Sequence, residues 1–207
     1  MQARPPLTIE QLQSEAAIFA GQQSLVSEPV LYGVTDGKAI GTYIELRFNT
    51  WLMSRYGYTA GNAAQGIDFP ELNVDLKVTS IRQPQSSSPY RSARQKIYGL
   101  GYSLLIFVYE KQDDLALQAA TLKIRHVIFV HAERTADFQI TRKIREILAA
   151  NGNEDDILAC IYDHHLPVDD ATATLLVEEI MRNPPVQGLL TISNALQWRL
   201  QYKRVIQ

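Results

Sequence analysis

The sequence has very little cysteine, no long apolar run and no excess of positive charge. Cys160 is the single cysteine among 207 residues, so no internal disulfide can form. Because no secretory signal is recognisable either, we expect a reducing, cytoplasmic location. The longest apolar run, Leu104–Tyr109, is far shorter than the ~20 residues that a membrane span requires. We therefore expect no membrane partner.

The net charge of −2 argues against a uniformly basic nucleic-acid coat, but the charge is unevenly distributed. Residues 76–109 contain no Asp or Glu. They do contain basic side chains, namely Lys77, Arg82, Arg91, Arg94 and Lys96. Such a segment is either a solvated loop or a surface that neutralises phosphates. Its position directly after the motif described below favours the second interpretation.

The hydrophobic pattern predicts helices and strands that together form one α/β domain. Helical spacing of apolar residues predicts helices over residues 8–21, 38–56, 137–150, 154–163, 169–181 and 193–205. β-forming segments predict two short strands joined by a turn within residues 67–81, and further strands at 104–109 and 126–130. Residues 113–121, between the last two strands, are expected to be a surface segment of one or two helical turns. Strands with helices before and after them predict a sheet that is covered on both faces. We treat residues 1–207 as a single domain, with 151–207 as a candidate helical subdomain.

The segment Gly66–Ser80 contains the groups from which we predict catalysis. Side chains two positions apart on a strand share a face, so Asp75 and Lys77 project together. A short turn lets the preceding strand bring Asp68 beside them. Two carboxylates are the minimum set of hard oxygen ligands for Mg²⁺, which polarises a phosphate and lowers the pKa of a bound water. Lys77 can hold that water and offset the charge that builds on the phosphorus.

Glu45 is the candidate third acid. It lies in a largely enclosed helix beside Ile44 and Phe48, where a carboxylate needs a partner. A metal ion, reached directly or through water, would be such a partner, and a salt bridge to Arg47 or another basic residue is an equal alternative. For Asp75 and Lys77 the alternative is an exposed ion pair on a strand.

These residues resemble the Asp…(Asp/Glu)-x-Lys signature of the PD-(D/E)xK nuclease superfamily. The surrounding sequence is similar to that of the mismatch-repair nicking endonuclease MutH and its related restriction enzymes. In that group an Asp-Phe pair is followed, after a short turn, by Val-Glu-Leu-Lys-Thr. The corresponding segments here are Asp68-Phe69 and Val74–Thr79, which reads Val-Asp-Leu-Lys-Val-Thr. Glu45 matches the metal-site Glu that the group places on the preceding helix.

The resemblance covers Gly41–Ser80, about a fifth of the chain. Asp75 stands where the closer group has Glu, and Ile67 rather than Pro precedes Asp68. The likeness implies a restriction-endonuclease-like fold, a mixed central β-sheet flanked by α-helices, to which this sequence adds a helical C-terminal part. It also implies Mg²⁺ as cofactor, double-stranded DNA as substrate and Asp68, Asp75 and Glu45 as metal ligands. We expect no organic cofactor.

The leading hypothesis is a type II site-specific deoxyribonuclease, or restriction endonuclease, that leaves 5′-phosphate and 3′-hydroxyl ends. Palindromic sites favour a two-fold protein, so we expect a homodimer. Two alternatives remain open. One is a DNA-repair nicking endonuclease or junction resolvase, and the other is a non-catalytic DNA-binding protein with a decayed nuclease site.

The basic segment after the motif supplies the predicted DNA contacts. Phosphate contacts set the register of a protein on DNA, and contacts to base edges set the sequence. We assign this role to Arg82, Gln83, Gln85, Arg91, Arg94 and Lys96. Arg199, Lys203 and Arg204, near the C-terminus, are interpreted as the solvated basic end of the last helix.

Overall fold

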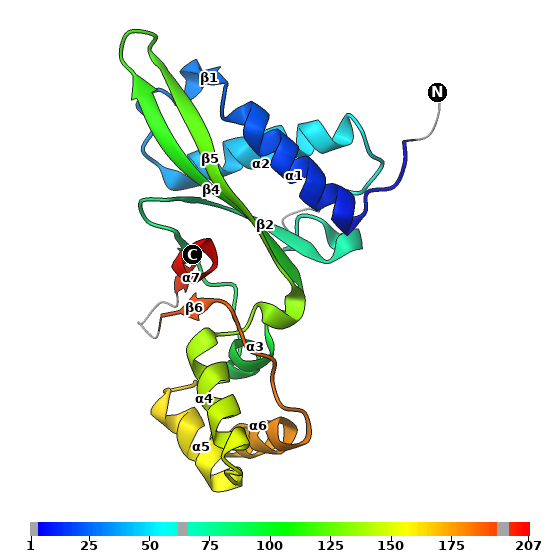
Figure 1. The fold of residues 1–207 in the computed structure, drawn as a ribbon, viewed down its shortest axis with the longest axis vertical. Coiled ribbons are helices and arrows are strands. Elements are labelled where there is room, and N and C mark those ends of the chain that lie inside the picture. Colours follow the sequence, from blue (N-terminus) through cyan, green and yellow to red (C-terminus); the bar gives the residue numbers. More distant parts are fainter. Residues whose placement is uncertain (1–3, 62–65, 194–198) are drawn as a thin grey trace. The chain divides into compact units, whose positions relative to one another are not determined.

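The computed structural model describes residues 4–61, 66–193 and 199–207. The chain divides into two compact units, each assembled from separate segments of sequence (Figure 1). The sheet unit comprises residues 1–84 and 104–129, and the helical unit comprises residues 85–103 and 130–207. The single-domain description from the sequence stays a prediction. Within the described part, no helix combines the length and the apolarity needed to span a membrane.

A four-stranded sheet with the order β1-β5-β4-β2 organises the sheet unit. Its strands are β1 (Ser27–Glu28), β2 (Val74–Ser80), β4 (Ser103–Asp114) and β5 (Ala119–Val130). β1 pairs antiparallel with β5, with Ser27 opposite Thr121. Two helices pack on this sheet, so the predicted α/β class, a mixed sheet flanked by helices, is confirmed.

β4 and β5 form a long hairpin (Figure 1), which corrects the expectation of helical turns at residues 113–121. The Asp114 carboxylate accepts the backbone N–H groups of Ala116 and Leu117 at 2.8 and 3.0 Å. Gln118 adopts a left-handed φ of 46°. An Asx turn followed by a left-handed residue closes a hairpin without any helix, and the two strands therefore extend beyond their predicted ends.

Two helices, α1 (Ile9–Gln23) and α2 (Gly37–Met53), begin where their capping residues predict. Thr8 and Gln11 form a reciprocal capping box at α1. The Asp36 carboxylate accepts the N–H groups of Lys38 and Ala39 at α2. The sequence prediction of an enclosed α2 is correct for one side only, because Leu46 is 65% exposed.

The core of the sheet unit fixes α2 against the sheet. Phe48 of α2 is fully buried, and its ring centroid lies 5.1 Å from that of Phe107 on β4 and 5.1 Å from that of Phe19 on α1. Phe69, just before β2, closes the same cluster at 6.3 Å from Phe48. Aromatic contacts of this kind restrict both position and rotation of the helix. The core therefore determines which α2 side chains face β2.

The helical unit contains α3 (Ala93–Tyr98), α4 (Phe138–Ala149), α5 (Glu154–Asp163) and α6 (Asp170–Arg182). Asp137, Asn153 and Asp169 cap the last three, in agreement with the predicted helix starts. A small antiparallel sheet with the order β3-β7-β6 completes the unit. Its strands are β3 (Gln85–Ser87), β6 (Thr191–Ile192) and β7 (Arg199–Gln201).

The predicted final helix over residues 193–205 is wrong, apart from residues 194–198, which lie outside the described residues. β7 occupies Arg199–Gln201, and only α7 (Lys203–Ile206) is helical. Leu200 and Tyr202 are both fully buried, which is the period-two pattern of a strand. The Tyr202 hydroxyl shares a 2.7 Å hydrogen bond with the hydroxyl of Ser86 on the neighbouring β3. Pairing with β3 thus overrides the weak helical pattern, and the helical C-terminal part ends at α6.

Gly99 marks a close approach of backbone segments in the helical unit. Its φ is +90°, and a Cβ atom there would lie 2.5 Å from the carbonyl oxygen of Ala132 and 2.8 Å from Oγ1 of Thr135. We expect Gly99→Ala to lower the free energy of unfolding by roughly 2–4 kcal/mol, through left-handed backbone strain and the clash together. Urea denaturation measures this loss, with Gly21→Ala as the control, since a Cβ at Gly21 meets nothing within 4 Å. Equal stability of the two variants would contradict the prediction.

Candidate active site

A tight turn before β2 brings Asp68 back onto that strand. Phe69 and Val74 form an antiparallel bridge, and the 3₁₀ turn Pro70–Leu72 with left-handed Asn73 connects them. Of the two short strands predicted within residues 67–81, the first is therefore present only as this one bridge. The Asp68 Oδ2 atom accepts the N–H of Leu76 at 2.8 Å. Asp68 is therefore anchored to the backbone of β2.

Asp75 and Lys77 project to the same side of β2, as the period-two pattern predicts. The Lys77 Nζ atom lies 2.7 Å from Oδ2 of Asp75. The exposed fractions of the two side chains are 26% for Lys77 and 6% for Asp75. The alternative of an exposed ion pair is therefore incorrect for the carboxylate, which is buried, while the Lys77 side chain is partly exposed.

The surroundings of Asp75 raise its pKa to about 6. Burial is the largest cause, and a hydrogen bond and the negative charge from Asp68 act in the same direction. Lys77 opposes them by favouring the ionised form. Two carboxyl groups and one ammonium thus converge at one point of the sheet unit.

Glu45 lies on the α2 turn that faces this point. Its pKa is raised by partial burial and by the charge of Asp68, and the charge of Lys77 lowers it. Arg47, the alternative partner of Glu45, instead lies 3.9 Å from Glu28. Glu45 therefore interacts with the candidate catalytic groups.

Among residues 4–61, 66–193 and 199–207, no three His, Cys, Asp or Glu side chains are arranged as a ready metal site. Asp68 and Asp75 nevertheless form a carboxylate pair, with Glu45 within electrostatic reach. Such a pair can hold a hard cation that completes its shell with water and phosphate oxygens. The assignment of Asp68, Asp75, Lys77 and Glu45 as catalytic residues stays a prediction.

The predicted DNA-binding residues occupy different environments. Arg82 and Gln83 are exposed in the turn after β2, and Arg91 is exposed just before α3. Gln85 is half-buried on β3. Their contribution to DNA binding stays a prediction.

Arg94 and Lys96 are committed to contacts within the helical unit. The Arg94 guanidinium makes a two-pronged ion pair with Glu179 of α6, at 2.6–3.2 Å. Lys96 is only 3% exposed; burial lowers its pKa, and the charge of the buried Asp137 opposes that shift. The acid-free sequence around them suggested surface positions, but the register of α3 turns Lys96 inward. Arg94 is exposed and Lys96 is buried, and the contribution of both to DNA binding stays a prediction.

We expect Lys96→Met to change stability without changing DNA binding. Lys96→Met removes the positive charge near the buried Asp137, whose carboxylate keeps its three backbone N–H donors. We therefore expect a cost of roughly 1–3 kcal/mol in folding free energy. The dependence of DNA affinity on salt, in contrast, is expected to be unchanged. Urea denaturation and fluorescence anisotropy with labelled duplex DNA measure the two effects. A flatter salt dependence in the folded variant would return Lys96 to the DNA interface.

Comparison with known proteins identifies the family. A family model described as Type II restriction enzyme NspV matches residues 6–207. The chain is 64% identical over 201 residues to the Type II restriction enzyme NspV of Nostoc sp. (strain ATCC 29411 / PCC 7524), covering 97% of this chain and 91% of the relative. The comparison with solved structures found no match. Because the family match takes in the described parts of both units, the chain belongs to the NspV family of type II restriction enzymes.

Proposed function

We propose that this protein cleaves double-stranded DNA at specific sites, with the reaction centred on Asp68, Asp75 and Lys77. The observation that carries the proposal is the convergence of these side chains at β2, where Lys77 Nζ lies 2.7 Å from Asp75 and Asp68 is held by the Leu76 N–H. Membership of a restriction-enzyme family supports DNA as the substrate. Hydrolysis adds the oxygen of a water to the phosphorus and breaks its bond to the 3′ oxygen. The products are a 5′-phosphate and a 3′-hydroxyl.

We further propose that Mg²⁺ binds at this carboxylate pair. Burial is the largest cause of the raised pKa values of Asp75 and Glu45. Asp68 raises both further, through a hydrogen bond and its charge at Asp75 and through its charge at Glu45. A cation would stabilise the ionised form of acids that repel one another, so these residues fit a divalent metal. Asp68 and Asp75 would hold the ion, with Glu45 reaching it directly or through water. When bound, it supplies Lewis acidity and a bound water of lowered pKa.

The residues of the chain then have separate tasks. The backbone N–H of Leu76 fixes the orientation of the Asp68 carboxylate. Lys77 is partly exposed, and its Nζ–H groups would donate to the attacking water and to a phosphate oxygen. Asp75 holds Lys77 in place through their ion pair. Buried positioning of this kind reduces the motion needed to reach the transition state.

Incubation with plasmid DNA tests the proposal. With Mg²⁺ we expect discrete linear fragments with reproducible ends, and with a chelator we expect none. Nicked circles without linear product would favour the nicking alternative. DNA binding without any cleavage, over a range of divalent metals, would favour the decayed-site alternative. Sequencing the fragment ends identifies the recognition site and the position of the cut.

Lys77→Ala is expected to slow cleavage by roughly 10²–10³-fold, because the variant loses the only proposed donor of positive charge from the chain to the scissile phosphate. Lys77→Arg retains the charge but changes its geometry, so we expect partial activity. Single-turnover cleavage with excess enzyme measures the chemical step. Metal-dependent cleavage at the wild-type rate by a folded Lys77→Ala protein would disprove the catalytic assignment.

We also propose a homodimer in the cytoplasm. A two-fold protein suits a palindromic site, and the absence of a second cysteine in the sequence suits a reducing compartment. Light scattering of the protein, alone and on a cleavage-site duplex, tests the oligomeric state. A single protomer on a fully cleaved duplex would contradict the dimer.

A further inference from the structure

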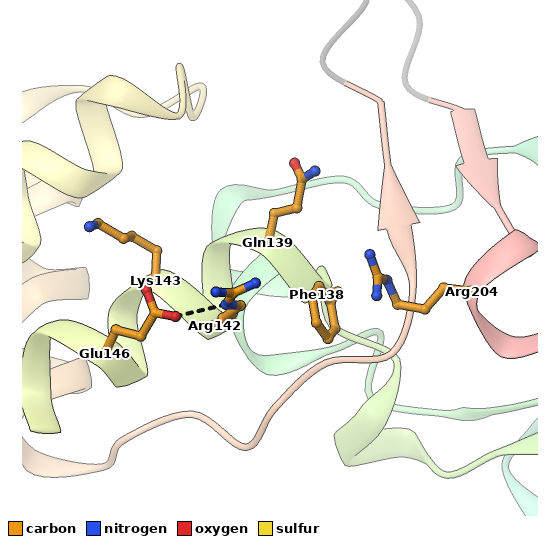
Figure 2. Close-up of a pocket in the computed structure, with 6 residues that line it drawn as sticks. All are labelled: Phe138, Gln139, Arg142, Lys143, Glu146 and Arg204. Atoms are coloured by element: carbon orange, nitrogen blue, oxygen red, sulfur yellow. Dashed lines mark hydrogen bonds and ion pairs between the residues drawn. The ribbon is translucent and has the colours of Figure 1, made fainter. Parts of the chain in front are cut away.

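A pocket lies between α4 and α7 in the helical unit, away in sequence from the proposed catalytic residues. Its volume is about 260 Å³, and its lining consists of Phe138, Gln139, Arg142, Lys143, Glu146 and Arg204 (Figure 2). α4 supplies five of these residues and α7 supplies Arg204. The pocket is therefore built from one face of α4 and from Arg204, a residue whose position in the sequence predicts a solvated helix end.

The pocket is positively charged. Arg142, Lys143 and Arg204 contribute three positive charges and Glu146 one negative charge, which gives a formal sum of +2. The Arg142 Nε atom donates to Glu146 Oε1 at 2.7 Å, so this pair is largely neutralised. Within the described part of the chain, neither Lys143 nor Arg204 makes an ion pair with a carboxylate. These two side chains supply the uncompensated charge.

Arg204 is held in place by an aromatic ring. Its guanidinium carbon lies 3.6 Å from the centroid of the Phe138 ring. Figure 2 shows the two side chains next to each other. Stacking of this kind occupies a flat face of the guanidinium and leaves the N–H groups at its edge able to donate. An arginine fixed in this way loses less conformational freedom when it binds a phosphate than a free surface arginine does.

The start of α4 does not add free donors to the pocket. The carboxylate of Asp137 already accepts the N–H groups of Gln139 and Ile140 at 2.8 and 3.1 Å. Recognition in the pocket would therefore depend on side chains. Gln139 is exposed at its rim and can donate its amide N–H groups.

We propose that this pocket binds the phosphate backbone of DNA, with Lys143 and Arg204 each donating to a different phosphate group. The proposal rests on the proposed function, because DNA is the polyanion on which that function acts. A phosphate bound here would fix the register of the helical unit on the duplex without reading its sequence. Arg142 would remain restrained by Glu146 and act as a weaker third donor.

The salt dependence of DNA binding tests the proposal. Each neutralised phosphate contributes about 0.9 to the slope of log affinity against log salt concentration. We expect Lys143→Ala and Arg204→Ala each to weaken binding and to reduce that slope by about one. The loss should be similar on a cleavage-site duplex and an unrelated duplex, since a phosphate contact carries no sequence information. Fluorescence anisotropy with labelled duplexes in a chelator measures this without cleavage.

Two further variants make the test independent of folding defects. Glu146→Gln removes the negative charge from the pocket, so we expect DNA binding to become about 2- to 5-fold tighter, which a damaged fold would not produce. Arg182→Ala, an exposed position at the end of α6, is the matched control and should leave the slope unchanged. Wild-type slopes in Lys143→Ala and Arg204→Ala would overturn the phosphate site while leaving the proposed function intact. A wild-type protein that neither binds nor cuts DNA would overturn both.

Discussion

Asp68→Asn is expected to reduce the rate of DNA cleavage by roughly 10³-fold or more, with no loss of folding or of DNA affinity. The Asp68 Oδ2 atom accepts the Leu76 N–H at 2.8 Å, and an amide oxygen can accept the same bond. The geometry of β2 is therefore preserved. The charge that we propose holds a divalent cation is lost, however, and a neutral amide is a poor ligand for Mg²⁺. Removing a negative charge beside the DNA should also leave binding in a chelator equal to or tighter than that of the wild type.

Asp36→Asn is the matched control for Asp68→Asn. It makes the same chemical change at the exposed N-cap of α2, where asparagine caps as well as aspartate. Single-turnover cleavage, anisotropy in a chelator and urea denaturation together separate catalysis, binding and stability. Wild-type cleavage by Asp68→Asn would remove this residue from the metal site. Loss of cleavage and of DNA binding together, in a folded protein, would assign Asp68 to binding instead.

The arrangement of the candidate catalytic residues could be predicted from the sequence because it depends on local rules. Asp75 and Lys77 are two positions apart on β2, and the alternation of a strand places them together whatever the rest of the fold does. Asp68 is joined to the same strand by a short turn that ends in left-handed Asn73. The partner of Glu45 was harder to predict, because Arg47 was near in sequence while Asp68 was near in space. The packing of α2 on the sheet through Phe48 decides between them.

Features that depend on distant pairing could not be predicted in the same way. Lys96 belongs to a basic, acid-free segment, yet the register of α3 buries it near Asp137. The final helix was predicted from helical spacing, but pairing of β7 with β3 makes Leu200 and Tyr202 alternate inward. The pocket was missed because Phe138 and Arg204 meet only in the folded chain. The one signal of this pocket in the sequence was the exposed face of α4. Polar residues recur there at helical spacing, namely Gln139, Arg142, Lys143 and Glu146.

Asp75→Asn is expected to abolish cleavage and at the same time to stabilise the metal-free protein above pH 6. In the folded state the pKa of Asp75 is about 6, above its ordinary value of 3.8, with burial as the largest cause. A carboxyl group with a raised folded pKa binds its proton more tightly in the folded state than in the unfolded state. The free energy of unfolding therefore falls as the pH rises from about 4 through 6, and the full penalty applies above that range.

Asparagine is neutral at every pH and similar in volume to aspartate, so the variant avoids this penalty. We expect a gain of roughly 1–3 kcal/mol in the free energy of unfolding at pH 7.5 and little difference at pH 4. Urea denaturation in a chelator at both pH values measures the gain.

Added Mg²⁺ should stabilise the wild type more at pH 7.5 than at pH 5, since the ion and the proton compete for the same carboxyl pair. It should stabilise Asp75→Asn little at either pH. A pH-independent difference between the two proteins would contradict a buried, proton-binding Asp75. Equal stabilisation of both by Mg²⁺ would place the ion elsewhere. The expected gain in stability with loss of activity follows if like charges are held together for the proposed binding of a metal ion and a scissile phosphate.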